Sequence, residues 1–83
     1  MKNIIAIIGL GYVGLPLALA FSKKFKVIGY DKNIERIKEL KKGIDKNKEN
    51  KINLRSLKKI TFSYNANDIS TANIFIITVP TPV

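Results

Sequence analysis

The stretch Ile4-Ile5-Ala6-Ile7-Ile8-Gly9-Leu10-Gly11-Tyr12-Val13-Gly14 decides the fold of this chain. Its isoleucine-rich run is too short for a helix and predicts a buried strand over residues 4–8. The three glycines that follow have the spacing G-x-G-x-x-G, and a helix is predicted over residues 12–24. A strand, a tight turn and a helix N-terminus in this order predict a binding site for a phosphate group.

Each glycine of this motif is expected to have a separate role in the turn. Gly9 allows the turn itself, Gly11 lets a pyrophosphate approach the backbone, and Gly14 lets the helix pack closely against the strand. The backbone N–H groups of Tyr12 and Val13 are expected to face the pyrophosphate. All five residues are therefore predicted to bind a dinucleotide cofactor.

The rest of the chain alternates between predicted strands and helices. Further strands are expected over residues 26–30, 60–63 and 73–79. A second helix follows the second strand, with Asn33 as its N-cap and Gly43 as its stop. Parallel strands joined by right-handed crossovers form a doubly wound sheet. The predicted fold class is therefore α/β, a partial and truncated Rossmann fold with strand order 3-2-1-4.

The spacing of apolar residues predicts which face of each helix is buried. The expected buried residues are Val13, Leu17, Ala20 and Phe21 in the first helix, and Ile34, Ile37, Leu40 and Ile44 in the second. Lys23 and Lys24 are expected in the last turn of the first helix, where cations suit the helix dipole. Residues 45–53 predict a loop, Asn53 predicts the cap of a short helix, and residues 68–71 predict a helical or turn segment.

Two charged residues follow the second strand. Asp31 lies at its carboxyl end, where the carboxylate can accept hydrogen bonds from both hydroxyls of an adenosine ribose. The same charge repels a 2′-phosphate and so favours NAD over NADP, although Lys32 and Arg36 are cations of the kind that NADP sites contain. Arg36 lies about one helical turn beyond Asp31. It is predicted to reach back over the cofactor, with a surface position as the alternative.

The segment Thr78-Val79-Pro80-Thr81-Pro82 ends the fourth strand. In the predicted topology it passes the nicotinamide side of the cofactor, and Thr81 offers a hydroxyl and a backbone N–H. Val79, Pro80 and Thr81 are therefore predicted cofactor-binding residues, with an ordinary turn at the end of a strand as the alternative.

The composition excludes several classes of site. The chain of 83 residues contains no cysteine and no histidine, so it has no disulfides, no Cys/His zinc site and no Cys or His catalysis of its own. Eleven of its 15 Lys and Arg residues lie between Lys32 and Lys59, and the net charge is +9. We interpret this stretch as a solvated basic surface without a nucleic-acid partner. No membrane segment or signal peptide is expected, so a cytoplasmic location is predicted.

The motifs Gly9-Leu10-Gly11-Tyr12-Val13-Gly14-Leu15-Pro16 and Val79-Pro80-Thr81-Pro82, together with Asp31 and Arg36, resemble the N-terminal part of the nucleotide-sugar 6-dehydrogenases. This is the UDP-glucose/GDP-mannose dehydrogenase family. The residues Gly43-x-Asp45 and Glu49, with the ending Ile-Thr-Val-Pro-Thr-Pro, are most similar to its UDP-N-acetylhexosamine branch.

The resemblance implies an NAD-dependent oxidation of the C6 alcohol of a UDP-N-acetylhexosamine, or of UDP-glucose, to a uronic acid for capsule and O-antigen polysaccharides. It implies cofactor roles for Gly11, Tyr12, Val13, Asp31, Arg36 and Thr81. It brings no catalytic residue, because the family's nucleophilic cysteine lies further downstream. Residues 1–83 are thus expected to be the N-terminal portion of an NAD-binding domain.

The family's dimerisation and UDP-binding domains lie beyond such a fragment, and the whole enzyme is expected to be a homodimer or larger. The fragment is expected to expose an apolar sheet edge, to self-associate and to bind cofactor at most. Three other classes of protein remain open. These are a Rossmann dehydrogenase of the hydroxyisobutyrate or 6-phosphogluconate type, a regulatory nucleotide-binding module without catalysis, and a basic nucleic-acid binder.

Overall fold

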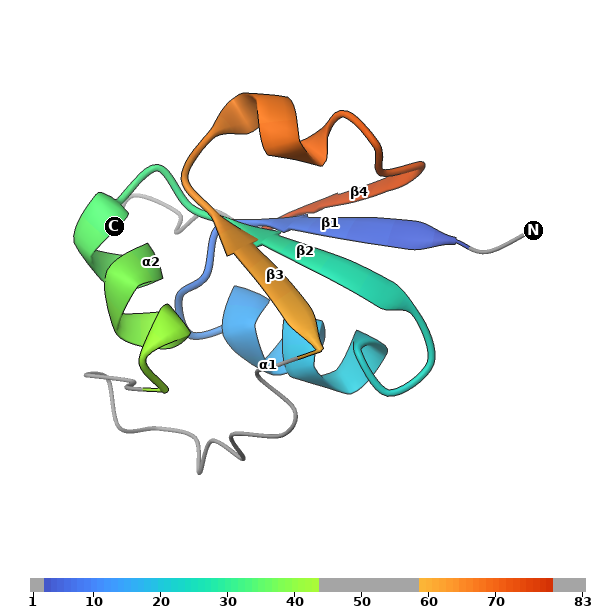
Figure 1. Ribbon diagram of the computed structural model, residues 1–83. Coiled ribbons are helices and arrows are strands. Elements are labelled where there is room, and N and C mark those ends of the chain that lie inside the picture. Colours follow the sequence, from blue (N-terminus) through green and yellow to red (C-terminus); the bar gives the residue numbers. More distant parts are fainter. Residues whose placement is uncertain (1–2, 44–58, 79–83) are drawn as a thin grey trace.

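A computed structural model describes residues 3–43 and 59–78 of the chain (Figure 1). The elements in chain order are β1 (Ile4–Ile8), α1 (Gly14–Phe21), β2 (Lys26–Tyr30), α2 (Ile34–Lys41), β3 (Ile60–Ser63), the 3-10 helix η1 (Ala66–Ile69) and β4 (Ile74–Ile77). The four strands are parallel and stand in the order β3-β2-β1-β4. The predicted α/β class and strand order are confirmed.

The sequence pattern locates the strands closely. β1, β2 and β3 have the predicted bounds, because each apolar run is short and ends in polar or glycine residues. β4 begins at Ile74, one residue later than predicted, and ends at Ile77. Asn73 is not part of the ladder. Its backbone N–H donates to the carbonyl of Ile4, and its side-chain Oδ1 accepts from the N–H of Ile4 at 2.8 Å.

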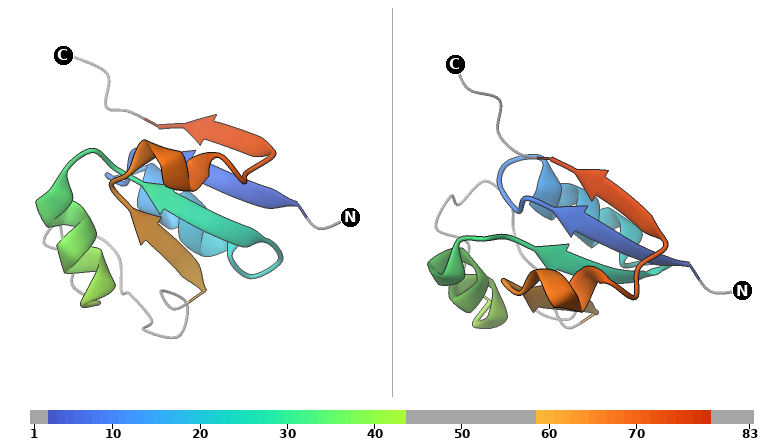
Figure 2. Two further views of the ribbon diagram at one scale, coloured as in Figure 1. Left: turned by 45° about the horizontal axis from the view of Figure 1, so that its top comes forward. Right: turned by 90° about the horizontal axis from the view of Figure 1, so that it is seen from above.

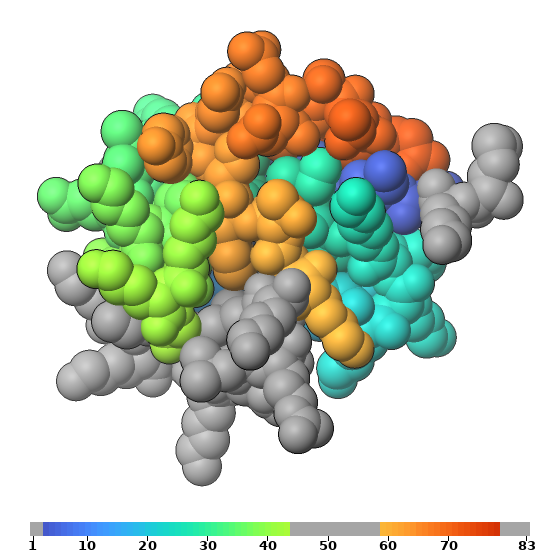
Figure 3. All heavy atoms as spheres, in the orientation of Figure 1, coloured from blue at the N-terminus to red at the C-terminus, as the bar shows by residue number. Residues whose placement is uncertain are grey.

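The sheet carries its helices mainly on one face. α1 packs against β1 and β2 and α2 against β3, whereas η1 lies against β2 on the opposite face (Figure 2). The space-filling view shows α2 beside β3, with the η1 residues above them (Figure 3). The core on the helical face consists of Ile5, Ile7, Leu10, Leu15, Ala18, Val27, Ile37, Leu40, Ile60 and Phe62.

Helix α1 is shorter than predicted. It begins at Gly14, two residues after the predicted start, and it ends at Phe21. Lys23 and Lys24 therefore follow the helix instead of lying in its last turn, and this expectation was wrong. Pro16 lies in the first turn, where its missing N–H leaves no intrahelical hydrogen bond unmade.

The buried face of α1 also differs from the predicted one. Leu15 and Ala18 are fully buried, whereas Val13 is 60% exposed and Ala20 is exposed. Leu17 and Phe21, also predicted to be buried, pack against the core while only partly buried. α1 is thus rotated about its own axis relative to the prediction. This rotation follows from the close approach of Gly14 to the end of β1, which is described below.

Helix α2 has the predicted ends. The Asn33 Oδ1 accepts hydrogen bonds from the backbone N–H groups of Glu35 at 3.1 Å and Arg36 at 3.2 Å. Gly43 follows the C-cap with a φ of 82°, a left-handed conformation that glycine adopts at little cost. The predicted stripe is confirmed at Ile37 and Leu40, which are buried, but Ile34 is 46% exposed, so that part was wrong.

Several other predictions concern the segment between α2 and β4. Ile44, the loop over residues 45–53 and the helix after Asn53 lie outside the described residues. η1 begins two residues before the predicted segment at 68–71, because the Asn65 side chain caps it by accepting from the N–H of Asn67 at 3.0 Å.

β4 is the outer strand of the sheet beside β1 (Figure 2). Three of its side chains are exposed: Ile74 at 37%, Phe75 at 51% and Ile77 at 67%. The predicted apolar edge is therefore confirmed, whereas self-association through it stays a prediction. Within residues 3–43 and 59–78, no helix has the length and apolar character needed to cross a membrane.

Candidate functional site: the glycine turn between β1 and α1

The three glycines of the turn have different structural environments. Gly9 has a φ of 98°, which requires a residue without a Cβ. A Cβ on Gly14 would lie 1.7 Å from the carbonyl oxygen of Gly9, so only glycine lets the helix start this close to the strand. A Cβ on Gly11 would meet no atom of residues 3–43 and 59–78 within 4 Å. The predicted structural roles of Gly9 and Gly14 are confirmed, and Gly11 borders open space.

The start of α1 lacks the groups that usually satisfy a helix N-terminus. Its N-cap residue is Val13, and its first turn contains no acid. In the part of the chain that the structure describes, no side chain bonds to its free N–H groups. Among the described residues, none accepts a hydrogen bond from the backbone N–H groups of Gly11, Tyr12 or Val13. The side chain of Tyr12 is 64% exposed. An anion can therefore be bound here by the N–H groups and the helix dipole.

The carboxylate of Asp31 lies against the turn. Its Oδ2 accepts a hydrogen bond from the N–H of Leu10 at 2.9 Å, and its Oδ1 accepts one from the N–H of Asn33 at 2.9 Å. A carboxylate has about four acceptor sites. Two of them are used by these backbone groups, so about two remain for the hydroxyls of a ribose.

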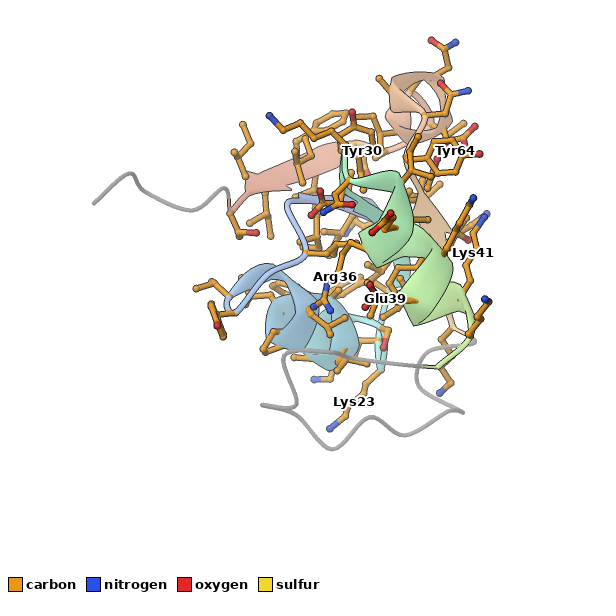
Figure 4. The ribbon with its side chains drawn as sticks, turned by 90° about the vertical axis from the view of Figure 1, so that its left-hand side faces the viewer. Lys23, Tyr30, Arg36, Glu39, Lys41 and Tyr64 are labelled. Atoms are coloured by element: carbon orange, nitrogen blue, oxygen red, sulfur yellow. The ribbon has the colours of Figure 1, made fainter. Side chains whose placement is uncertain are left out.

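Arg36 reaches the same turn from α2. Its Nε donates to the carbonyl oxygen of Leu10 at 2.8 Å, and Figure 4 shows the side chain extending from α2 toward α1. The residue is half-buried, so it is not a simple surface arginine. Its predicted contact with the cofactor stays a prediction.

Thr78 follows β4 and completes the turn from the other side. Its Oγ1 donates to the carbonyl oxygen of Gly9 at 2.6 Å, and its backbone N–H donates to the carbonyl of Ile8 at 2.8 Å. A Cβ on Gly14 would lie 2.5 Å from this hydroxyl. Gly14, the Gly9 carbonyl and the Thr78 hydroxyl are therefore packed together. The sequence places Thr78 in the segment that is predicted to pass the cofactor, but it does not predict Thr78 as a binding residue. A hydroxyl next to the segment at 79–81 was the only available signal.

A pocket of about 420 Å³ opens beside the turn. It lies between residues 8–11, after β1, and residues 30–33, after β2, and Asp31 lines it. This is the crevice at the carboxyl ends of parallel strands where ligands bind in doubly wound sheets. Its volume is within the range of small-molecule sites, roughly 300–1,000 Å³. Lys32 also lines the pocket, whereas Val79, Pro80 and Thr81 lie outside the described residues.

These features fit a dinucleotide. The open space at Gly11 and the N–H groups without acceptors suit a pyrophosphate, and the Asp31 carboxylate at the wall of the pocket suits a ribose. A parallel sheet of this order with such a turn defines a nucleotide-binding domain of the Rossmann class.

Comparison with known proteins narrows this class to one family. Residues 3–83 match the model described as "UDP-glucose/GDP-mannose dehydrogenase family, NAD binding domain". The chain therefore belongs to the UDP-glucose/GDP-mannose dehydrogenase family, and the cofactor of its domain is NAD. This membership separates it from the hydroxyisobutyrate and 6-phosphogluconate types of dehydrogenase.

Individual relatives agree with the family. Over 85 residues the chain is 47% identical to a UDP-N-acetyl-D-glucosamine 6-dehydrogenase of Pseudomonas aeruginosa, covering 100% of this chain and 20% of that protein. It is 51% identical over 80 residues to the enzyme of the same name from Salmonella typhi, covering 95% and 19%. A solved structure of a UDP-D-ManNAc dehydrogenase from Pyrococcus horikoshii matches with a TM-score of 0.86 and 38% identity, covering 96% and 21%. The chain thus spans about a fifth of the length of these relatives.

Proposed function

We propose that this chain is the N-terminal part of the NAD-binding domain of a UDP-N-acetylhexosamine 6-dehydrogenase, which oxidises the C6 alcohol of its sugar to the uronic acid. Two of the relatives named above are UDP-N-acetyl-D-glucosamine 6-dehydrogenases by name, and they match this chain over 100% and 95% of its length. The observation that carries the proposal is the glycine turn. It combines open space at Gly11 with an uncapped helix start and an adjacent carboxylate.

Within this proposal each part of the turn has one task. The N–H groups of Gly11, Tyr12 and Val13 bind the pyrophosphate, and the Asp31 carboxylate accepts hydrogen bonds from the adenosine ribose. Arg36 and residues 79–81 complete the cofactor site. The bound NAD supplies the hydride acceptor, and the residues of this chain bind and orient it.

The rest of the activity belongs to the longer protein that the relatives represent. The chain has no cysteine, so the nucleophile expected for this family lies outside it. We propose a UDP-N-acetylhexosamine as substrate, with UDP-glucose as the alternative, and a polysaccharide precursor as product. We also propose a cytoplasmic location and a homodimer or larger assembly for the whole enzyme.

Substitution of Asp31 by alanine tests the cofactor site. Asp31→Ala removes the charged acceptor for the ribose hydroxyls, so we expect the Kd for NAD, measured by titration calorimetry, to rise at least about 10-fold. The preference for NAD over NADP is expected to fall, because the charge that repels a 2′-phosphate is gone.

A matched control exists on the other side of the sheet. Asp68 also accepts a hydrogen bond, from the Ser63 hydroxyl, but lies in η1 and does not line the pocket. We expect Asp68→Ala to leave the Kd for NAD unchanged. Unaltered NAD binding in Asp31→Ala would show that the ribose assignment is wrong.

A further inference from the structure

The peptide group that joins Gly9 to Leu10 is held at both of its polar atoms by side chains. Its carbonyl oxygen accepts the hydrogen bond from Thr78 Oγ1 at 2.6 Å, and its N–H donates to Asp31 Oδ2 at 2.9 Å. The two side chains follow β4 and β2, which lie on either side of β1. One peptide group therefore connects the ends of two strands that are not neighbours in the sheet.

The hydroxyl of Thr78 has a single hydrogen to give. Two carbonyl oxygens lie near it, that of Gly9 at 2.6 Å and that of Ile8 at 3.3 Å. The carbonyl of Ile8 already accepts from the backbone N–H of Thr78 at 2.8 Å. The shorter contact is the typical length of an O–H···O hydrogen bond, so the hydroxyl hydrogen is assigned to Gly9.

Orientation matters at this peptide because Gly9 has a left-handed φ of 98°. A glycine rotates more easily than any other residue, so its conformation must be set by its surroundings. If the Gly9–Leu10 peptide rotates, the Leu10 N–H leaves Asp31. The carboxylate then loses one of the two N–H groups that fix its position.

We propose that Thr78 is a positioning residue of the NAD site, which orients the Asp31 carboxylate through the Gly9–Leu10 peptide. This inference rests on the proposed function for its effect on cofactor binding. Its effect on the peptide itself does not depend on the cofactor.

The test compares Thr78→Ala with Thr78→Ser. Serine keeps the hydroxyl and alanine removes it, so the difference between the two variants isolates the hydrogen bond to Gly9. Valine is unsuitable, since a methyl group would replace an oxygen that lies 2.6 Å from a carbonyl oxygen.

Hydrogen exchange of individual amides gives the first measurement. We expect the Leu10 N–H to exchange about 5-fold faster in Thr78→Ala than in Thr78→Ser. The reference is the N–H of Ile37, which donates to the Asn33 carbonyl in α2 and should not change. Equal exchange of Leu10 in the two variants overturns the proposal, and so does equal acceleration of Leu10 and Ile37, which indicates general destabilisation.

The Kd for NAD gives the second measurement. Thr78→Ala is expected to weaken binding about 5-fold relative to Thr78→Ser when Asp31 is present, and to have no further effect in the Asp31→Ala background. An effect of the same size in both backgrounds overturns the proposal, because Thr78 then acts independently of Asp31. If the unsubstituted chain does not bind NAD, the proposed function of the chain fails, and the exchange of Leu10 still decides whether Thr78 holds the peptide.

Discussion

Helices α1 and α2 begin in opposite ways. The N-terminus of α2 is satisfied by the chain itself, because the Asn33 side chain accepts hydrogen bonds from two of its N–H groups. Glu35 also places a negative charge in its first turn. The N-terminus of α1 has neither a capping side chain nor an acid. Both helices contain eight residues and connect neighbouring parallel strands. The difference teaches that the helix whose N-terminus stays open is the one positioned for an anionic ligand.

The largest expected effect comes from placing a methyl group where α1 touches the strand. In Gly14→Ala the Cβ would lie 1.7 Å from the Gly9 carbonyl oxygen, and a backbone atom cannot move away at low cost. We expect the free energy of unfolding to fall by about 3 kcal/mol, measured by urea denaturation.

Gly11→Ala is the matched comparison, since its Cβ enters open space. We expect a change in unfolding free energy of no more than about 0.5 kcal/mol, but weaker NAD binding. Equal destabilisation by the two substitutions would contradict the division of roles between these glycines.

Smaller changes in stability and in NAD binding are expected when the N-terminus of α1 is given a negative charge like that of α2. Val13→Asp places a negative charge at the N-terminus of α1, at a position that is 60% exposed and has room for the side chain. The charge should stabilise the ligand-free chain by about 0.5 kcal/mol. It should also raise the Kd for NAD about 10-fold, because it competes with the pyrophosphate for the same N–H groups.

Calorimetric titration and thermal unfolding of Val13→Asp measure the two effects. Val13→Asn is the control, because it adds a polar side chain of similar size without the charge. Tighter NAD binding by Val13→Asp would remove the basis for the comparison between the helices.

An effect smaller than this 10-fold change in Kd, which corresponds to about 1.4 kcal/mol, is expected at the helix that is already capped. Asn33→Ala removes the acceptor of two hydrogen bonds, so the unfolding free energy should fall by about 1 kcal/mol. Asn33→Asp keeps an acceptor and should stay close to the unsubstituted chain. Circular dichroism during urea denaturation measures both variants. If Asn33→Ala is as stable as Asn33→Asp, the side-chain cap contributes nothing to α2.

Much of the fold follows from patterns that are local in the sequence. Short apolar runs predict the strands, and their parallel order follows from the intervening helices and the handedness of crossovers. Asn33 and Gly43 predict the ends of α2 because capping depends on neighbouring backbone groups. The start and rotation of α1 could not be predicted in this way. They depend on the contact of Gly14 with Gly9 and Thr78, which only the folded chain brings together.

The candidate site also has some features that the local sequence predicts and others that depend on the folded chain. The glycine spacing and Asp31 predict a phosphate turn and a carboxylate, because both lie at fixed positions in a strand–turn–helix unit. The partners of Arg36 and Thr78 are backbone carbonyls of the turn. No residue type identifies such an acceptor in advance, since every residue carries a carbonyl.

The hydrogen bond between Thr78 and Gly9 joins positions that are 69 residues apart. β1 is likewise paired with β4, so one of the two inner strands of the described sheet has a neighbour that is distant in the chain. Contacts of this separation form slowly, because a long segment must lose its conformational freedom before they form. During synthesis, the whole glycine motif is made within the first 14 residues, whereas the hydroxyl that bonds to Gly9 is added only with residue 78. The hydrogen bond from Thr78 therefore joins the glycine turn only after β4 has been made.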